Sequence, residues 1–166
     1  KPSVDREIAR QFMVGLMDET YHNPIQDLEK VFGVKFKATK EEVEAKQDEN
    51  LEKFSFDSLA KIKELTGKDV DRLKLETALA RWLEKEATVS SEKRPDYDSD
   101  WEKKIKQRLE QFNIAIPSEV AINIYTSLIQ NETAHSSNLI KVYQISGTPI
   151  PEGLAQQAYR KYLSSD

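Results

Sequence analysis

Ile114 to Ile129 reads IAIPSEVAINIYTSLI, and 34 residues later Thr148 to Leu163 reads TPIPEGLAQQAYRKYL. The two stretches repeat one phrase, which pairs Ile116 with Ile150, Pro117 with Pro151, Val120 with Leu154, Ala121 with Ala155 and Tyr125 with Tyr159. A repeat near this length is typical of stacked helical hairpins, because one hairpin alone cannot bury its apolar face. We therefore expect the prolines to begin equivalent helices and the tyrosines to fill equivalent layers.

The residues around the first copy of the phrase also suit a β-hairpin. Residues 120–129 and 139–145 are rich in β-branched and aromatic side chains, which favour strands. In the first of these segments, however, the polar residues Asn123, Ser127 and Gln130 fall on one face of a helix, whereas a period of two mixes them with apolar residues. The periodicity favours helices, and a β-hairpin over residues 120–146 stays as the alternative.

Helical signals also cover the earlier part of the chain. A helix capped by Ser3 has apolar residues spaced by four, with a second apolar row beside them, and we expect this one wide stripe to face the core: Val4, Ile8, Phe12 and Leu16, with Ala9, Met13 and Met17 alongside. Caps and apolar spacings predict further helices over residues 24–32, 39–50, 55–66, 69–86 and 99–113.

The segments between these helices, and one helix itself, have an unusual composition. The helix over residues 39–50 is so polar that we expect it to be held weakly. Residues 34–38 read as an extended linker, and residues 88–98 as an exposed loop. The sequence thus predicts an all-α fold of seven or eight helices packed as antiparallel helical hairpins, whose C-terminal third is a short degenerate helical-repeat stack.

The charged residues are distributed unevenly along the chain. Only seven of them follow residue 112, namely Glu119, Glu132, Lys141, Glu152, Arg160, Lys161 and Asp166. This change in composition predicts a charged helical subdomain over residues 1–112 and a weakly charged helical-hairpin subdomain over residues 113–166, packed together as one globular unit.

Composition narrows the class of protein further. The chain has 166 residues, no Cys and a net charge of -4, which argues against a general binder of nucleic-acid backbones. No apolar run approaches the roughly 20 residues that a membrane span requires. We expect a soluble protein, with the cytoplasm favoured over other compartments, and the first residue, Lys1, is consistent with a processed or excised chain.

Few residues form patterns that indicate catalysis or metal binding. Asp18 and His22 lie four residues apart, as in half of a metal site, but the only other histidine, His135, has no recognisable spacing to them. No glycine-flanked nucleophile or phosphate-binding loop is present. We therefore predict no metal, no cofactor and no catalytic residue. An enzyme whose site is built from carboxylates remains a second alternative.

The repeated phrase offers a candidate binding surface. Two such helices side by side would line a shallow, nearly neutral groove with Asn123 and Ser127 from one helix and Gln157 and Lys161 from the other. Such a groove suits a peptide or a protein segment. The sequence therefore favours a non-catalytic module, such as an adaptor, scaffold or chaperone-like protein, that binds another protein of unknown identity. RNA or single-stranded nucleic-acid binding by helical repeats is the first alternative.

The phrase also resembles the units of tetratricopeptide and pentatricopeptide arrays, over residues 114–163. When Tyr125 is set on the tetratricopeptide tyrosine, Ala134 falls on the next small position of that family. Asn138, however, stands where that family has an aromatic residue, and Gly147 with Pro151 closes a hairpin shorter than a pentatricopeptide unit. The resemblance implies stacked helical hairpins, and we claim membership of neither family.

Overall fold

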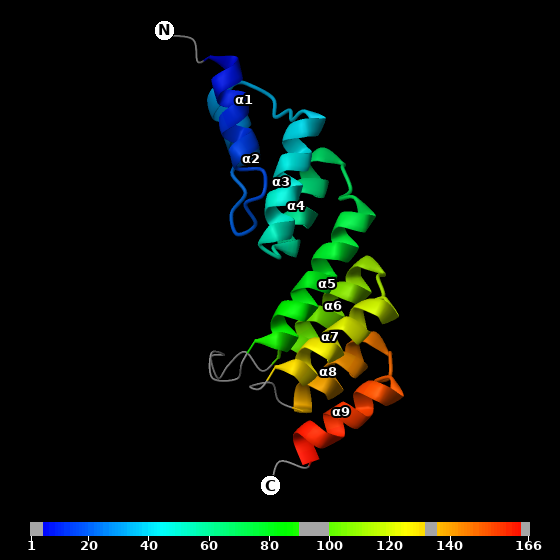
Figure 1. Ribbon diagram of the computed structural model, residues 1–166. Helices are drawn as coiled ribbons and strands as arrows, with labels where there is room; N and C mark the ends of the chain where they lie inside the picture. Colours follow the sequence, from blue (N-terminus) through cyan, green and yellow to red (C-terminus); the bar gives the residue numbers. More distant parts are fainter. Residues whose placement is uncertain (1–4, 90–99, 132–135, 164–166) are drawn as a thin grey trace. The chain divides into compact units, whose positions relative to one another are not determined.

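The computed structural model describes residues 5–89, 100–131 and 136–163, and this part of the chain is helical without strands (Figure 1). It forms nine helices: α1 (Arg6–Gly15), α2 (Ile25–Phe32), α3 (Lys40–Glu52), α4 (Phe56–Thr66), α5 (Arg72–Thr88), α6 (Trp101–Phe112), α7 (Ser118–Gln130), α8 (Ser136–Ser146) and α9 (Glu152–Leu163). The predicted all-α class is confirmed, with one helix more than expected. The β-hairpin alternative is wrong, because α7 and α8 occupy its place.

The chain divides into two compact units, Lys1–Leu75 and Glu76–Asp166. The division falls inside α5, one turn after its start. The boundary that we predict from charge, between residues 112 and 113, lies within the second unit, where α6 packs against α8. The position between residues 112 and 113 is therefore where the density of charged residues changes. As a boundary between subdomains, it stays a prediction.

In the first unit, α1 is capped by Asp5, whose carboxylate accepts hydrogen bonds from the backbone N–H groups of Glu7 (2.9 Å) and Ile8 (3.4 Å). The start that we predict at Ser3 lies outside the described residues. The helix ends at Gly15, and the chain then turns toward α2, which stops at Gly33 in the left-handed conformation.

Of the two rows in the wide apolar stripe that we predict on α1, one faces the core and the other does not. Ile8 and Phe12 are 66% and 53% exposed, whereas Ala9 and Met13, each one residue later, are buried. The two stripes are both spaced by four and lie next to each other on the helix, so the spacing alone does not decide between them. Packing in the first unit selects the second stripe, which continues to the buried Met17.

The polar helix α3 is held firmly, contrary to our expectation. Its start is fixed by a capping box, in which the Thr39 hydroxyl and the Glu42 carboxylate each accept the other residue's backbone N–H. Glu42 also accepts two hydrogen bonds from Arg10 of α1, at 2.7 and 2.8 Å. Asn50 is buried and donates to Asp18 at 2.9 Å. These polar contacts add to the burial of Val43 and Leu51 on the same helix.

The rest of the first unit packs around α3 and α4, which lie side by side. Met17, Val43 and Ile62 form a buried cluster there. The predicted linker over residues 34–38 is extended, and Phe36 and Ala38 cover this cluster from it. The helix α4 is followed by Gly67, which is in the left-handed conformation.

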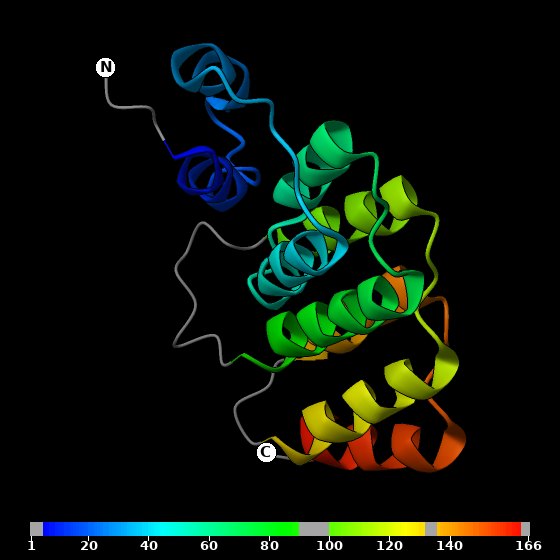
Figure 2. The ribbon, with the colours of Figure 1, turned by 90° about the horizontal axis from the view of Figure 1, so that it is seen from above.

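In the second unit, α7 contacts both its neighbour and the helix after it. The helix α7 packs against α8 and against α9, and α6 packs against α8; Figure 2 shows α7 lying beside α9. Contacts between helices one and two places apart are those of stacked hairpins. The ammonium of Lys141 on α8 lies 5.1 Å from the centre of the Trp101 ring on α6.

The two prolines of the repeated phrase begin equivalent helices, as predicted. The carbonyl of Pro117 accepts from the N–H of Ala121 at 3.2 Å at the start of α7, and the carbonyl of Pro151 accepts from the N–H of Ala155 at 2.8 Å at the start of α9. Between them, α8 ends at Gly147, which is in the left-handed conformation with φ of 69°. Among the described helices, none has the length and apolar character to cross a membrane.

Candidate functional site

The two tyrosines of the repeated phrase lie in unlike surroundings, and our prediction that they fill equivalent layers is wrong. Tyr125 on α7 is fully buried, whereas Tyr159 on α9 is 63% exposed. The same holds one turn earlier, where Ala121 is buried and Ala155 is exposed. The repeat therefore reproduces the start of a helix but not its environment.

Tyr125 is buried by α8 and the segment that follows it. Its hydroxyl donates to the backbone carbonyl of Thr148 at 2.7 Å, just beyond the end of α8. Burial raises the pKa of Tyr125, and a hydrogen bond with Ser146 at the end of α8 acts in the opposite direction. The face of α7 that carries Tyr125 thus contacts the end of α8, the helix with which α7 forms a hairpin.

The inner side of α9 faces α7, and Lys161 anchors it there. Its ammonium donates to the carbonyl of Leu128 at 2.8 Å and also to the carbonyl of Asn131. These carbonyls belong to the C-terminal end of α7, where the helix leaves acceptors unpaired and a positive charge is favourable. Ala158, on the same side of α9, is buried. Tyr162 next to Lys161 is partly buried, and this burial raises its pKa.

The four residues that we predict to bind a partner are placed as follows. Asn123 on α7 and Gln157 on α9 are exposed, and Ser127 on α7 is half-buried. Lys161 crosses from α9 to α7, so its ammonium is engaged within the chain. Of the four, Lys161 is the residue for which the structure gives a contact between the two helices, and its role there is structural. Partner binding by these residues stays a prediction.

Sequence reasoning missed the exposed apolar residues of α8 and α9. Ile140 and Tyr143 on α8 are 59% and 52% exposed, and Leu163 on α9 is 66% exposed, close to the value for Tyr159. Large exposed apolar side chains amid few charges are common on protein-binding surfaces. The signal in the sequence was the low charge after residue 112, but the periodicity does not tell which apolar residues remain uncovered.

The second unit also has a cleft of about 450 Å³ between the end of α6 and the end of α8. Its walls combine apolar and polar side chains, with Leu109 and Ile114 at the base and Lys106, Glu110 and Gln144 around them. One acidic and one basic residue leave it nearly neutral. It contains no arrangement of a nucleophile beside a base.

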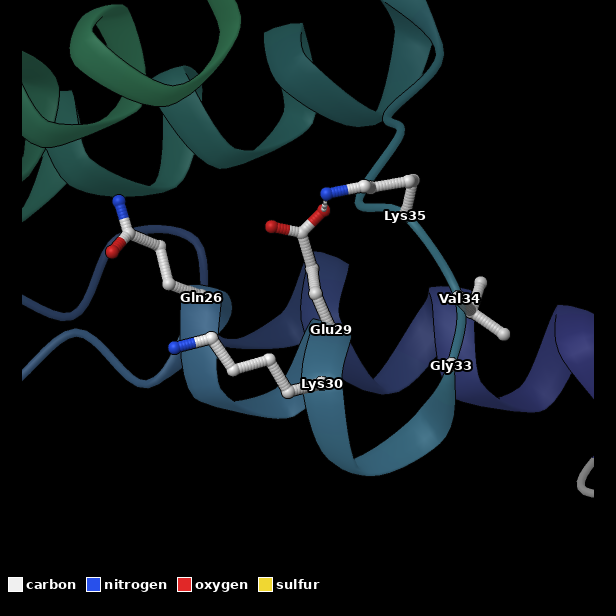
Figure 3. Close-up of a pocket in the computed structure, with 6 residues that line it drawn as sticks. All are labelled: Gln26, Glu29, Lys30, Gly33, Val34 and Lys35. Atoms are coloured by element: carbon white, nitrogen blue, oxygen red, sulfur yellow. Dashed lines mark ion pairs between the residues drawn. The ribbon is translucent and has the colours of Figure 1, made fainter.

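In the first unit, a cleft of about 560 Å³ lies along α2 and the linker after it (Figure 3). Glu29 points toward the linker, where it accepts the backbone N–H of Phe36 at 2.9 Å and lies 3.9 Å from the ammonium of Lys35. Gln26 and Lys30 line the cleft on the side of α2. The one carboxylate in it holds the linker in place, so the arrangement is that of a structural contact.

A second cleft of the first unit, of about 370 Å³, lies between α3 and the segment that joins α4 to α5. The buried Gln47 is at its base and donates to the carbonyl of Lys68 at 3.4 Å. Its rim carries charges of both signs, and Lys74 there pairs with Asp48 at 2.8 Å. The hydrogen bond with Asp48 raises the pKa of Lys74.

The pairing of Asp18 and His22 as half of a metal site assumed that both lie on one helix, and this assumption is wrong. The helix α1 ends at Gly15, and Asp18 instead lies 3.5 Å from the ammonium of Lys46 and accepts from Asn50. In the described ranges, no group of three or more His, Cys, Asp or Glu side chains is arranged to hold a metal ion. His135 lies outside those ranges.

The carboxylates of α3 are also engaged in contacts within the chain. Hydrogen bonds from Arg10, and a further one from the backbone of Thr39, lower the pKa of Glu42 to about 2. Glu44 lies 3.8 Å from the ammonium of Lys40. A general acid near neutral pH needs a raised pKa, and Glu42 has the opposite shift.

No family model matches this chain, and neither do any of the curated proteins or solved structures with which it was compared. The likeness to tetratricopeptide and pentatricopeptide arrays therefore remains a resemblance of the repeated phrase.

Proposed function

We propose that the chain is a non-catalytic protein–protein interaction module of the adaptor, scaffold or chaperone-like kind, which binds its partner through α8 and α9. The observation that carries this proposal is the set of large apolar side chains that these two helices expose: Ile140, Tyr143, Tyr159 and Leu163. They occur in the part of the chain with the fewest charges. Aromatic residues in such surroundings dominate many binding interfaces.

The alternative of RNA binding has less support. It needs a basic groove, and of the two basic residues in the last turn of α9, Lys161 donates to carbonyls at the end of α7. The proposal of a protein partner therefore predicts binding that changes little with ionic strength, whereas contacts with phosphates weaken steeply as salt is added.

Photo-crosslinking from single positions tests the proposal. A photoreactive amino acid is placed at position 143 or 159, with position 31 as control, because Val31 is a similarly exposed apolar residue of the first unit. We expect adducts with one protein of the native source from positions 143 and 159. Adducts from position 31 alone, or adducts with RNA, would contradict the proposal. Surface positions suit this test because a cut near residue 113 would split the second unit.

A further inference from the structure

We propose that the cleft between α3 and the segment joining α4 to α5 binds a zwitterionic α-amino acid. Gln47 and Asp71 hold the ammonium of this ligand, and Lys68 holds its carboxylate. The cleft lies entirely within the first unit. The site is therefore independent of the proposed function, which concerns α8 and α9 of the second unit.

Gln47 is a buried polar side chain that is only half satisfied. It is 6% exposed and lies at the base of the cleft, where its amide nitrogen donates to the carbonyl of Lys68 at 3.4 Å. Its carbonyl oxygen accepts no hydrogen bond from any residue that the structure describes. Among those residues, no fully enclosed side-chain nitrogen or oxygen lacks a partner, so this oxygen is open to the cleft. A polar group in such a place calls for a hydrogen-bond donor.

The charges around this oxygen are balanced. The lining of the cleft includes three basic and three acidic side chains, namely Lys40, Lys68, Lys74, Glu44, Asp69 and Asp71. A simple ion of either sign would meet like charges as well as opposite ones, which weakens its binding. A ligand with one positive and one negative group can meet opposite charge at both ends. The lining therefore favours a zwitterion over a simple anion or cation.

Two of these charged groups remain available to a ligand. The other four are paired: Lys74 with Asp48 at 2.8 Å, Asp69 with Lys63 at 2.7 Å, and Lys40 with Glu44 at 3.8 Å. Within the described part of the chain, Lys68 and Asp71 form no ion pair. One oxygen of Asp71 accepts the backbone N–H of Lys74 at 2.9 Å, which leaves its other oxygen free. Lys68 and Asp71 have opposite signs and belong to the same wall of the cleft.

The chemistry of the ligand follows from these groups. Its ammonium donates to the free oxygen of Asp71 and to the carbonyl of Gln47, and its carboxylate accepts from the ammonium of Lys68. The cleft volume of about 370 Å³ is near the lower end of the range for small-molecule sites, which suits a single amino acid. Val43, the apolar residue of the lining, is 3% exposed and offers little surface to a ligand side chain. Recognition thus depends on the two charged groups that α-amino acids share.

Nuclear magnetic resonance of the full chain tests the proposal with L-alanine as the probe. Titration to about 10 mM brings a site with a millimolar dissociation constant close to saturation. The side-chain amide signal of Gln47 and the backbone amide signals of Lys68 and Asp71 should shift along one saturable curve. N-acetyl-L-alanine lacks the ammonium and L-alaninamide lacks the carboxylate, so each should bind about tenfold more weakly or less.

Substitutions at the two unpaired charges locate the binding. Lys68→Gln and Asp71→Asn should each weaken the affinity for L-alanine about tenfold. Asparagine at position 71 can still accept the N–H of Lys74, so the start of α5 is kept. The matched control is Lys37→Gln, which removes an exposed lysine outside the cleft and should leave the affinity unchanged.

Three results would overturn the proposal. The first is that the signals of Gln47, Lys68 and Asp71 do not shift with L-alanine. The second is an equal affinity for L-alanine and its N-acetyl form or its amide, since the cleft would then bind single ions rather than a zwitterion. The third is an affinity that Lys68→Gln and Asp71→Asn both leave unchanged.

Discussion

Tyr125 is fully buried against α8, whereas Tyr159, its counterpart 34 residues later, has 63% of its surface exposed. The two side chains occupy the same place in a repeated phrase and follow prolines that begin helices in the same way. Tyr125 lies against the end of α8 and the segment that follows it, where its hydroxyl donates to the carbonyl of Thr148. The difference in exposure between the two tyrosines is the basis of the proposed binding surface.

The buried tyrosine should contribute to stability where the exposed one does not. Tyr125→Phe removes the hydroxyl that donates to Thr148 and leaves that carbonyl without its partner, which should lower the free energy of unfolding by about 1–2 kcal/mol. Both tryptophans, Trp82 and Trp101, belong to the second unit, so urea unfolding followed by their fluorescence reports on it. Tyr159→Phe should change the value by less than about 0.5 kcal/mol. Equal losses would contradict the assignment.

Lys161 should act as a cap for α7 from outside that helix. Lys161→Met keeps most of the apolar stem but removes the ammonium that donates to Leu128 and Asn131, so the second unit should lose about 1–2 kcal/mol of stability. Hydrogen exchange should rise in the last turn of α7. Gln157→Met, on the exposed side of α9, serves as the control. An unchanged exchange rate in α7 would show that Lys161 has no capping role.

Helix boundaries in this chain could be predicted because their signals lie within a few residues. Thr39 with Glu42 marks the start of α3, Gly33 and Gly67 mark the ends of α2 and α4, and Pro117 precedes α7. Each signal acts through the local backbone: a side chain accepts a nearby N–H, or a residue adopts a conformation that a helix cannot continue. No knowledge of the packing is needed.

The environment of individual residues could not be predicted in the same way. Ile8 and Met13 belong to two apolar stripes of equal spacing on α1, and only packing decides which stripe is buried. Tyr159 shares its local sequence with Tyr125, yet its side chain is exposed where that of Tyr125 is buried. Asn50 is polar and still buried, because it donates a hydrogen bond to Asp18. That partner lies 32 residues away in the sequence, so the local pattern around Asn50 does not reveal it.

The pairing of Glu42 with Arg10 should make the first unit sensitive to acid. Its folded-state pKa of about 2 lies below the ordinary value of 4.5, so the stabilisation is fully present above pH 4.5 and is lost as the pH falls from there toward 2. Glu42→Gln should lower the stability at neutral pH and flatten this part of the profile. Urea unfolding followed by circular dichroism between pH 7 and about 2 measures it. Glu41→Gln, at an exposed neighbour, should keep the wild-type slope, and an equally steep profile in Glu42→Gln would contradict the account.

The buried amide of Asn50 should be needed to hold α3. Asn50→Ala removes its hydrogen bonds to Asp18 and to the carbonyl of Lys46, so we expect a loss of about 1–3 kcal/mol. Hydrogen exchange of the α3 amides should increase with it. Glu52→Ala, at an exposed position of the same helix, should have little effect. Equal exchange in the two variants would indicate that α3 is held by its few apolar contacts.

The most direct test of the binding role is hydroxyl-radical footprinting of the chain alone and bound to the partner recovered by crosslinking. We predict that Tyr159 and Leu163 are labelled in the free chain and protected in the complex, while Tyr125 is protected in both and Val31 is labelled in both. If Tyr159 and Leu163 stay labelled in the complex while Val31 becomes protected, the partner binds the first unit and the account is contradicted.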